Sequence, residues 1–188
     1  MKKILSAISL MALMGSAWAA PETYVIDGKH TFPRFSYSHF GYSTQLSRFD
    51  KTTGTIVLDT AAKQGSAKVI IDTTSVNTGL ALFNEHIQKE EFFDTGKFPT
   101  ATFVSSQFNF EGDLLKSIDG KLTIKGISKD LSLSISSFLC MLHPMAKKEA
   151  CGVNASTVVK RSDFNMGKHV PYVSDEVRID IPVEAIKQ

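Results

Sequence analysis

Hydrophobic and polar residues alternate along most of this chain, which is the pattern of β-strands with one buried face and one solvent-facing side. The clearest alternating stretches are residues 30–39, 100–110, 117–125, 131–138 and 176–184. Shorter extended segments are predicted at residues 24–27, 54–59, 68–75 and 153–161. In the first long stretch Phe35, Tyr37 and His39 share one face and Arg34 lies on the other, so these three side chains should point inward.

One stretch, residues 80–103, breaks this alternation. Leu80, Phe83 and Ile87 recur at helical spacing and predict a short helix with one apolar stripe. A following run of Phe92-Phe93-Asp94-Thr95-Gly96, with Pro99, ends the helix. The helix could be a lid over one end of a β-structure, with Phe83, Ile87, Phe92 and Phe93 on a tunnel or its mouth. It could equally be a connection that plugs its own core.

About eight strands follow one another with hairpin-like links, including a hairpin turn at residues 126–129. An eight-stranded antiparallel β-barrel with one short helical insertion satisfies this pattern and leaves no exposed sheet edge. A sandwich of two sheets would use the same strands and stays open as an alternative. A barrel of eight strands is wide enough to hold side chains or one small ligand.

The first 19 residues are typical of a secretory signal peptide. Lys2 and Lys3 precede an apolar run that is too short to span a bilayer, and Ala17-Trp18-Ala19 fits a cleavage site. We therefore expect one domain at residues 20–188, in the periplasm or outside the cell, with no transmembrane segment. Without Lys2 and Lys3 the 21 basic residues fall to 19, equal to the 19 acidic ones, which argues against a nucleic-acid partner.

Two cysteines remain in that domain, Cys140 and Cys151. In an oxidising compartment an even count favours a disulfide that closes one local loop. The alternative is a metal site formed with His143, for which a fourth ligand is missing from the nearby sequence.

Motifs for catalysis are hard to find. The five histidines form no HxH or HExxH pattern, and the sequence contains no GxSxG, phosphate loop or dinucleotide glycine pattern. An enzyme, a cofactor and a metal are therefore not expected. Phenylalanine is abundant instead, with thirteen in the chain, among them Phe49, Phe98 and Phe103. These rings either fill a core or line a greasy tunnel.

Several motifs together resemble the YceI-like family of periplasmic proteins, over essentially the whole of residues 20–188. They are Tyr24-Val25-Ile26-Asp27 with His30-Thr31, His39-Phe40-Gly41, residues 54–59, His86-Ile87 leading to Phe92-Phe93-Asp94, Phe98-Pro99, Thr102-Phe103, residues 120–126 and Arg161-Ser162-Asp163-Phe164. Three positions depart from the family pattern: Ser47 and Asn165 stand where glycine is common, and Lys160 stands where an acid is common.

The resemblance implies an extended lipocalin-like barrel that binds a polyisoprenoid, an isoprenoid quinone or a fatty-acid-like lipid, with aromatic walls around the tail and polar groups at the mouth. Other hydrophobic molecules such as amphipathic toxins, an accessory role in quinone redox chemistry, or a filled structural barrel are the alternatives. A homodimer is possible. The expected ligand-binding residues are Phe35, Tyr37, His39, Phe49, Phe83, Ile87, Phe92, Phe93, Phe98, Phe103, Arg161 and Phe164.

Overall fold

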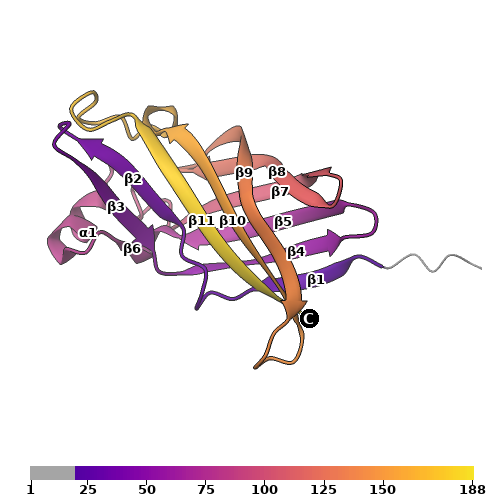
Figure 1. Ribbon diagram of the computed structural model, residues 1–188. Helices are drawn as coiled ribbons and strands as arrows, with labels where there is room; N and C mark the ends of the chain where they lie inside the picture. The colour runs from indigo at the N-terminus through magenta and orange to yellow at the C-terminus, as the bar shows by residue number, and fades with distance from the viewer. Residues whose placement is uncertain (1–19) are drawn as a thin grey trace, which may run out of the picture.

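A computed structural model describes residues 20–188, so the predicted signal peptide at residues 1–19 lies outside the described part of the chain. Eight antiparallel strands form a closed barrel (Figure 1). Around the ring they are β1 (Glu22–Ile26), β4 (Thr52–Asp59), β5 (Gln64–Asp72), β7 (Thr100–Glu111), β8 (Leu114–Ile124), β9 (Ile127–Leu142), β10 (Glu149–Lys160) and β11 (Glu176–Lys187). The ring closes because β1 pairs with β4 on one side and with β11 on the other, which excludes the two-sheet sandwich.

Strand β11 has two partners along one of its edges. Its C-terminal part pairs with β1, with Ile186 opposite Val25, while its N-terminal part pairs with β2 (Arg34–His39), with Ile179 opposite Phe35. Two further strands, β3 (Ser43–Phe49) and β6 (Val76–Asn77), continue the sheet from β2. The barrel wall is therefore extended at one end, which the count of about eight strands did not foresee.

Helix α1 (Ala81–Ile87) lies beside β6 at this extended end, at the left of Figure 1. Two 3-10 helices, η1 (Thr73–Ser75) and η2 (Arg161–Phe164), complete the described elements. Ile87 is buried and Phe83 packs against the core, as the helical spacing predicts. Leu80, the third residue of the predicted stripe, is the residue before the helix and is exposed, so that part of the stripe prediction is wrong.

The register of β2 is the one expected from its alternation. Phe35 is buried, Arg34 is exposed, and His39 lies on the same face as Phe35 but is exposed because the strand ends there. The β8–β9 hairpin is also found, although its turn is shorter than predicted. Lys125 and Gly126 both have positive φ, 49° and 73°, which is the backbone of the two-residue turn that matches strand twist.

The cysteine prediction is confirmed, in a different setting from the one expected. Cys140 and Cys151 form a disulfide, and they face each other directly on β9 and β10 with their Cα atoms 4.0 Å apart. Both strands continue beyond the bridge, so the true loop spans only residues 143–148. Because each sulfur is bonded to the other, the alternative metal site with His143 is excluded.

Candidate functional site

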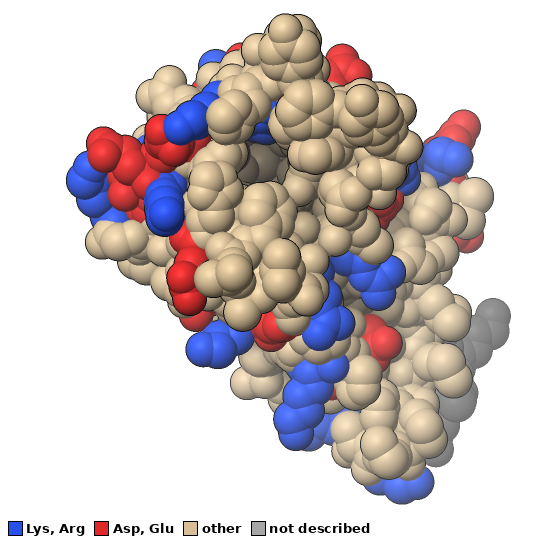
Figure 2. All heavy atoms as spheres, turned by 90° about the vertical axis from the view of Figure 1, so that its left-hand side faces the viewer, with Lys and Arg blue, Asp and Glu red and all other residues tan. Residues whose placement is uncertain are grey.

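The barrel encloses an apolar cavity of about 450 Å³, and the wall continues along β2 and β3 to the extended end. Figure 2 looks onto that end and shows a hollow bordered mostly by uncharged side chains. A cavity of this size and character falls in the range that proteins use for small apolar ligands. The structure therefore supports a hollow barrel lined by phenylalanine side chains over a core that they fill.

Small side chains on the wall leave this volume free. Ala67, Ala101 and Ala155 all face inward and are nearly fully buried. Large neighbours surround Ala101, which is two residues before Phe103 on β7 and opposite Ile71 on β5. A leucine at such positions would fill space with three more carbon atoms, so the alanines keep the centre of the barrel open.

Three phenylalanines from different elements form the apolar wall beneath the mouth. Phe93 follows α1, and its ring meets Phe35 of β2 and Phe49 of β3 edge-on, with centroids 6.0 and 5.4 Å away. The Phe35 and Phe49 rings are themselves 5.5 Å apart. Edge-to-face packing of this kind is the favoured geometry for aromatic pairs. The segment after α1 is thus fixed against the strands that extend the barrel.

Two rows of aromatic side chains border the mouth. One row runs through Phe83, His86, Phe92 and His169, with successive ring centroids 5.9, 5.0 and 6.4 Å apart. The other contains His39, Phe40 and Tyr172, with successive separations of 4.7 and 5.8 Å. The rows come from α1 and the chain after it, from the β2–β3 turn, and from the loop at residues 165–174. All of these residues except Tyr172 line the cavity.

Arg161 anchors the loop at residues 165–174. Its guanidinium group donates to the backbone carbonyls of Met166, Lys168, Val173 and Ser174. Only 8% of the residue is exposed, and this burial lowers the pKa of its side chain. Since its donors are directed to the backbone, Arg161 shapes the mouth by positioning this loop.

An ion pair between Lys168 and Glu91 joins the same loop to the segment after α1. Lys125 at the β8–β9 turn reinforces this link, because its ammonium group donates to the carbonyls of Glu90 and Asn165 at 2.7 and 3.0 Å. The two sides of the mouth that carry Phe92 and His169 are therefore connected by charged groups outside the aromatic row.

Few polar atoms face the interior. Thr52 is 2% exposed, and its hydroxyl oxygen has no hydrogen-bond partner among residues 20–188. By contrast, the fully buried Thr31 hydroxyl donates to the carbonyl of Glu184 and accepts from its amide. Burial raises the pKa of the Tyr37 hydroxyl, which also faces the cavity. Thr52, Tyr37 and Thr157 all line the cavity, so a polar atom of a ligand could meet their hydroxyl groups inside.

Ten of the twelve predicted ligand-binding residues line the cavity: Phe35, Tyr37, His39, Phe49, Phe83, Ile87, Phe92, Phe93, Phe103 and Arg161. The other two do not. Phe98 packs against Gly126 at the β8–β9 turn, and Phe164, the last residue of η2, is 1% exposed within the packed core. Phe98 precedes Pro99 and lies before β7 begins at Thr100. The alternation of β7 therefore does not predict where its side chain points.

Much of the aliphatic wall was missed by sequence reasoning. Its members are Val69, Ile71, Ile118, Leu122, Leu133, Val177, Ile179 and Ile181. The signal was available, since Leu122 and Leu133 occupy inward positions of strictly alternating strands.

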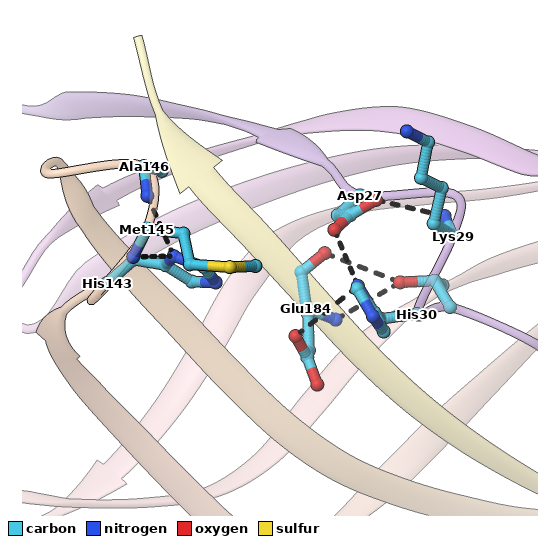
Figure 3. Close-up of polar contacts among 8 residues, drawn as sticks. Asp27, Lys29, His30, His143, Met145, Ala146 and Glu184 are labelled. Atoms are coloured by element: carbon cyan, nitrogen blue, oxygen red, sulfur yellow. Dashed lines mark hydrogen bonds and ion pairs between the residues drawn. The ribbon is translucent and has the colours of Figure 1, made fainter.

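Away from the cavity, a polar cluster ties the β1–β2 connection to β11 (Figure 3). The His30 ring Nδ1 is 2.7 Å from Asp27 Oδ2 and 4.0 Å from Glu184 Oε2. The hydrogen bond between His30 and Asp27 is the main reason that the pKa of Asp27 is lowered and that of His30 is raised. These three residues are metal-capable donors, but their pairing already accounts for their geometry.

His143 has a local structural part in the β9–β10 loop, also drawn in Figure 3. Its Nδ1 accepts hydrogen bonds from the backbone amides of Met145 and Ala146, at 3.2 and 3.0 Å. His30 and His143 are thus engaged in turns, whereas His39, His86 and His169 lie at the mouth of the cavity.

Comparison with known proteins agrees with this geometry. The model of the YceI-like domain matches residues 24–185. Protein YceI of Salmonella arizonae is 36% identical over 194 residues, and the alignment covers the whole of both chains. Within residues 20–188, no helix is long and apolar enough to cross a membrane.

Solved structures share the architecture. BcnA of Burkholderia cenocepacia superimposes with a TM-score of 0.72 at 26% identity, over 85% of this chain and 98% of BcnA. The YCEI protein of Campylobacter jejuni gives 0.70 at 28% identity, over 80% and 90%. A polyisoprenoid binding domain from Saccharophagus degradans gives 0.65 at 19% identity, over 88% and 98%, which is a likeness of fold.

Proposed function

The chain belongs to the YceI-like family, and from this premise we propose that it is a binding protein for a long isoprenoid or a similar amphiphilic lipid, without catalytic activity of its own. The observation that carries the proposal is the closed barrel with an apolar cavity of about 450 Å³ and an aromatic mouth. The polyisoprenoid binding domain from Saccharophagus degradans, which has the same fold, supports this ligand class. The predicted signal peptide and the Cys140–Cys151 bridge support a periplasmic or secreted location.

Binding would be driven by burial of the lipid tail. Each methylene group removed from water contributes roughly 0.8 kcal/mol, so about ten buried carbons contribute on the order of 8 kcal/mol before the costs of association. The ring wall of Phe35, Phe49 and Phe93 would contact the tail. A polar headgroup would remain near the mouth, where His39, His86 and His169 offer imidazole groups.

A second candidate is an isoprenoid quinone or another small amphipathic molecule whose polar atoms enter the cavity. The unpartnered hydroxyl of Thr52 favours this candidate, because a quinone carbonyl could accept its hydrogen bond. A saturated or purely isoprenoid tail would leave this hydroxyl unpaired.

Organic extraction of the natively purified protein, followed by mass spectrometry of the extract, tests both candidates. We expect a lipid in near-stoichiometric amount from the wild type and little from an Ala155→Phe variant, in which a ring occupies the cavity. Val158→Phe is the matched control, because Val158 is on the same strand but faces outward. A lipid-free wild type, or equal loading of the Ala155→Phe variant, would contradict the proposal.

A further inference from the structure

Exposed apolar side chains gather around the mouth of the cavity. Tyr42, Leu82 and Tyr172 are 89%, 73% and 67% exposed, and Phe40 is 51% exposed. They belong to the β2–β3 turn, to α1 and to the loop at residues 165–174, which all lie at the left end of the molecule in Figure 1. We call these four residues the mouth patch. Isolated apolar residues on a surface are normal, but a group of them around an opening marks an interaction site.

The three aromatic rings of the mouth patch pack together on the surface of the protein. Phe40 stacks on Tyr172 at 5.8 Å and on Tyr42 at 6.4 Å between centroids. A hydrogen bond of 2.7 Å from the Phe40 amide to the Tyr172 carbonyl joins the two loops. The aromatic cluster is thus fixed in an exposed position by both side-chain and backbone contacts.

The β2–β3 turn places Phe40 at the tip of a hairpin. Phe40 has φ of 54° and Gly41 has φ of 73°, the left-handed backbone of a tight turn, as at Lys125 and Gly126. A bulky ring therefore occupies a turn position next to the opening of the cavity.

These observations lead us to propose that the mouth patch docks on the surface of a lipid bilayer, so that the cavity opens directly onto the membrane. The inference rests on the proposed function, because a lipid ligand must leave or enter a bilayer. Tyrosine and other aromatic rings are enriched where proteins meet the membrane–water interface. The patch is continuous with the cavity through Phe40, which belongs to both, so a lipid tail would pass from bilayer to barrel without crossing water.

The chemistry of the patch favours a membrane over the other possible occupants. A stable dimer buries roughly 20–30 residues from each partner, which is far more than this cluster of side chains offers. Charge contributes little, since Lys168 beside the mouth is already paired with Glu91. Insertion of apolar rings, rather than attraction to anionic headgroups, should therefore drive binding.

Flotation with phosphatidylcholine vesicles that contain no isoprenoid lipid tests this surface alone. We expect the wild type to float with the vesicles at both low and high salt. A Tyr42→Ser/Leu82→Ser/Tyr172→Ser variant should bind on the order of tenfold more weakly, as expected when apolar area is removed from an interfacial anchor. None of these three residues lines the cavity, so weaker flotation of the variant would not come from a changed cavity wall.

A Leu139→Ser/Met141→Ser/Met145→Ser variant is the matched control. These residues are also 58–82% exposed, but they lie at the C-terminal end of β9 and in the β9–β10 loop. That end of β9 pairs with the part of β10 that meets the C-terminal part of β11, away from the mouth. This variant should float like the wild type. A wild type that does not float, a control that loses as much binding as the mouth variant, or a wild-type dimer that the mouth variant converts to a monomer would each overturn the proposal.

The extraction experiment separates this inference from the proposed function. A wild type that is loaded with lipid but does not float with vesicles would contradict the membrane-docking proposal and leave the lipid-binding proposal intact. A lipid-free wild type that still floats, and loses flotation in the mouth variant, would support the docking surface and overturn the lipid cargo.

Discussion

His30 lies between Asp27 and Glu184 where β1 meets β11, and its charge controls how strongly these segments attract one another. Its pKa is raised above its ordinary value of 6.5, and that of Asp27 is lowered below 3.8, chiefly through their shared hydrogen bond. The His30 contribution to stability is complete below pH 6.5 and is lost as the pH rises through the raised folded-state pKa. The Asp27 contribution is present above pH 3.8 and is lost as the pH falls through its lowered pKa.

A His30→Gln variant should therefore differ most from the wild type between about pH 4 and 6.5, where both partners are charged. The difference in free energy of unfolding should shrink as the pH rises through the raised folded-state pKa of His30, because the wild-type ring then loses its charge. Denaturant unfolding of both proteins at a series of pH values measures it. A difference that stays constant as the pH rises from about 5 through that range would show that the charge of His30 does not matter.

Thr52 and Thr31 form a natural pair for testing what an unpaired hydroxyl costs. Thr52→Val removes a hydroxyl without a partner, so delipidated protein should keep its stability or gain up to about 1 kcal/mol. Thr31→Val leaves the Glu184 amide without its acceptor and should cost about 1–3 kcal/mol. Urea unfolding of the two variants decides this. Equal losses would mean that the Thr52 hydroxyl is satisfied in the folded protein.

At the scale of elements, alternation in the sequence predicted nearly every strand, because a half-buried strand must alternate. The pairings that close and extend the barrel, β1 with β11 and β2 with β11, join residues more than 140 positions apart and leave no local signal. The predicted disulfide placed residues 140–142 in the local loop that it closes. They are paired with β10 instead, since hydrogen bonding across the hairpin continues past the bridge.

The same limit applies to the cavity. Alternation correctly predicted that the side chains of Phe35 and Phe103 point inward. Phe98 and Phe164 lie outside regular strands, so the directions of their side chains depend on tertiary packing. Whether the barrel is filled or hollow depends on the summed volumes of facing side chains. Ala67, Ala101 and Ala155 decide that sum, and alanine at an inward position carries no sequence signal of its own.

Phe93 serves both the cavity wall and the packing between α1 and the strands. Phe93→Ala should lower lipid occupancy and also lower the free energy of unfolding by roughly 2–4 kcal/mol, because its contacts with Phe35 and Phe49 are lost. Phe98→Ala is the control from the same segment, and it should lower stability without changing occupancy. Mass spectrometry of bound lipid and melting of delipidated protein measure both properties. Equal loss of lipid occupancy in the two variants would show that Phe93 has no specific role in binding the ligand.

On the scale of the whole molecule, the two ends of β11 are stabilised in different ways. Near its C-terminus, β1 closes the ring and the Cys140–Cys151 bridge joins the neighbouring strands. Near its N-terminus, the wall continues through β2, and the loop at residues 165–174 lies at the mouth, where Arg161 binds its carbonyls. Asn165 has φ of 55° and so begins this loop in the left-handed conformation. Access to the cavity should therefore depend on the mouth loop, while the opposite end stays fixed.

Arg161→Met tests this division, because methionine keeps an unbranched apolar stem but removes every side-chain hydrogen bond from this residue to the loop. We expect faster hydrogen exchange at the amides of residues 166–173, faster release of bound lipid, and a loss of stability on the order of 2 kcal/mol. Exchange in the ring strands β5, β7 and β8 should be unchanged under native conditions, since none of them contacts this loop through Arg161.

Arg178→Met is the control. Arg178 is an exposed arginine on β11 that pairs with Asp180, and such pairs contribute roughly 0–1 kcal/mol. If Arg161→Met accelerates exchange throughout the barrel, or leaves lipid release unchanged, Arg161 stabilises the fold as a whole and the loop does not control the mouth.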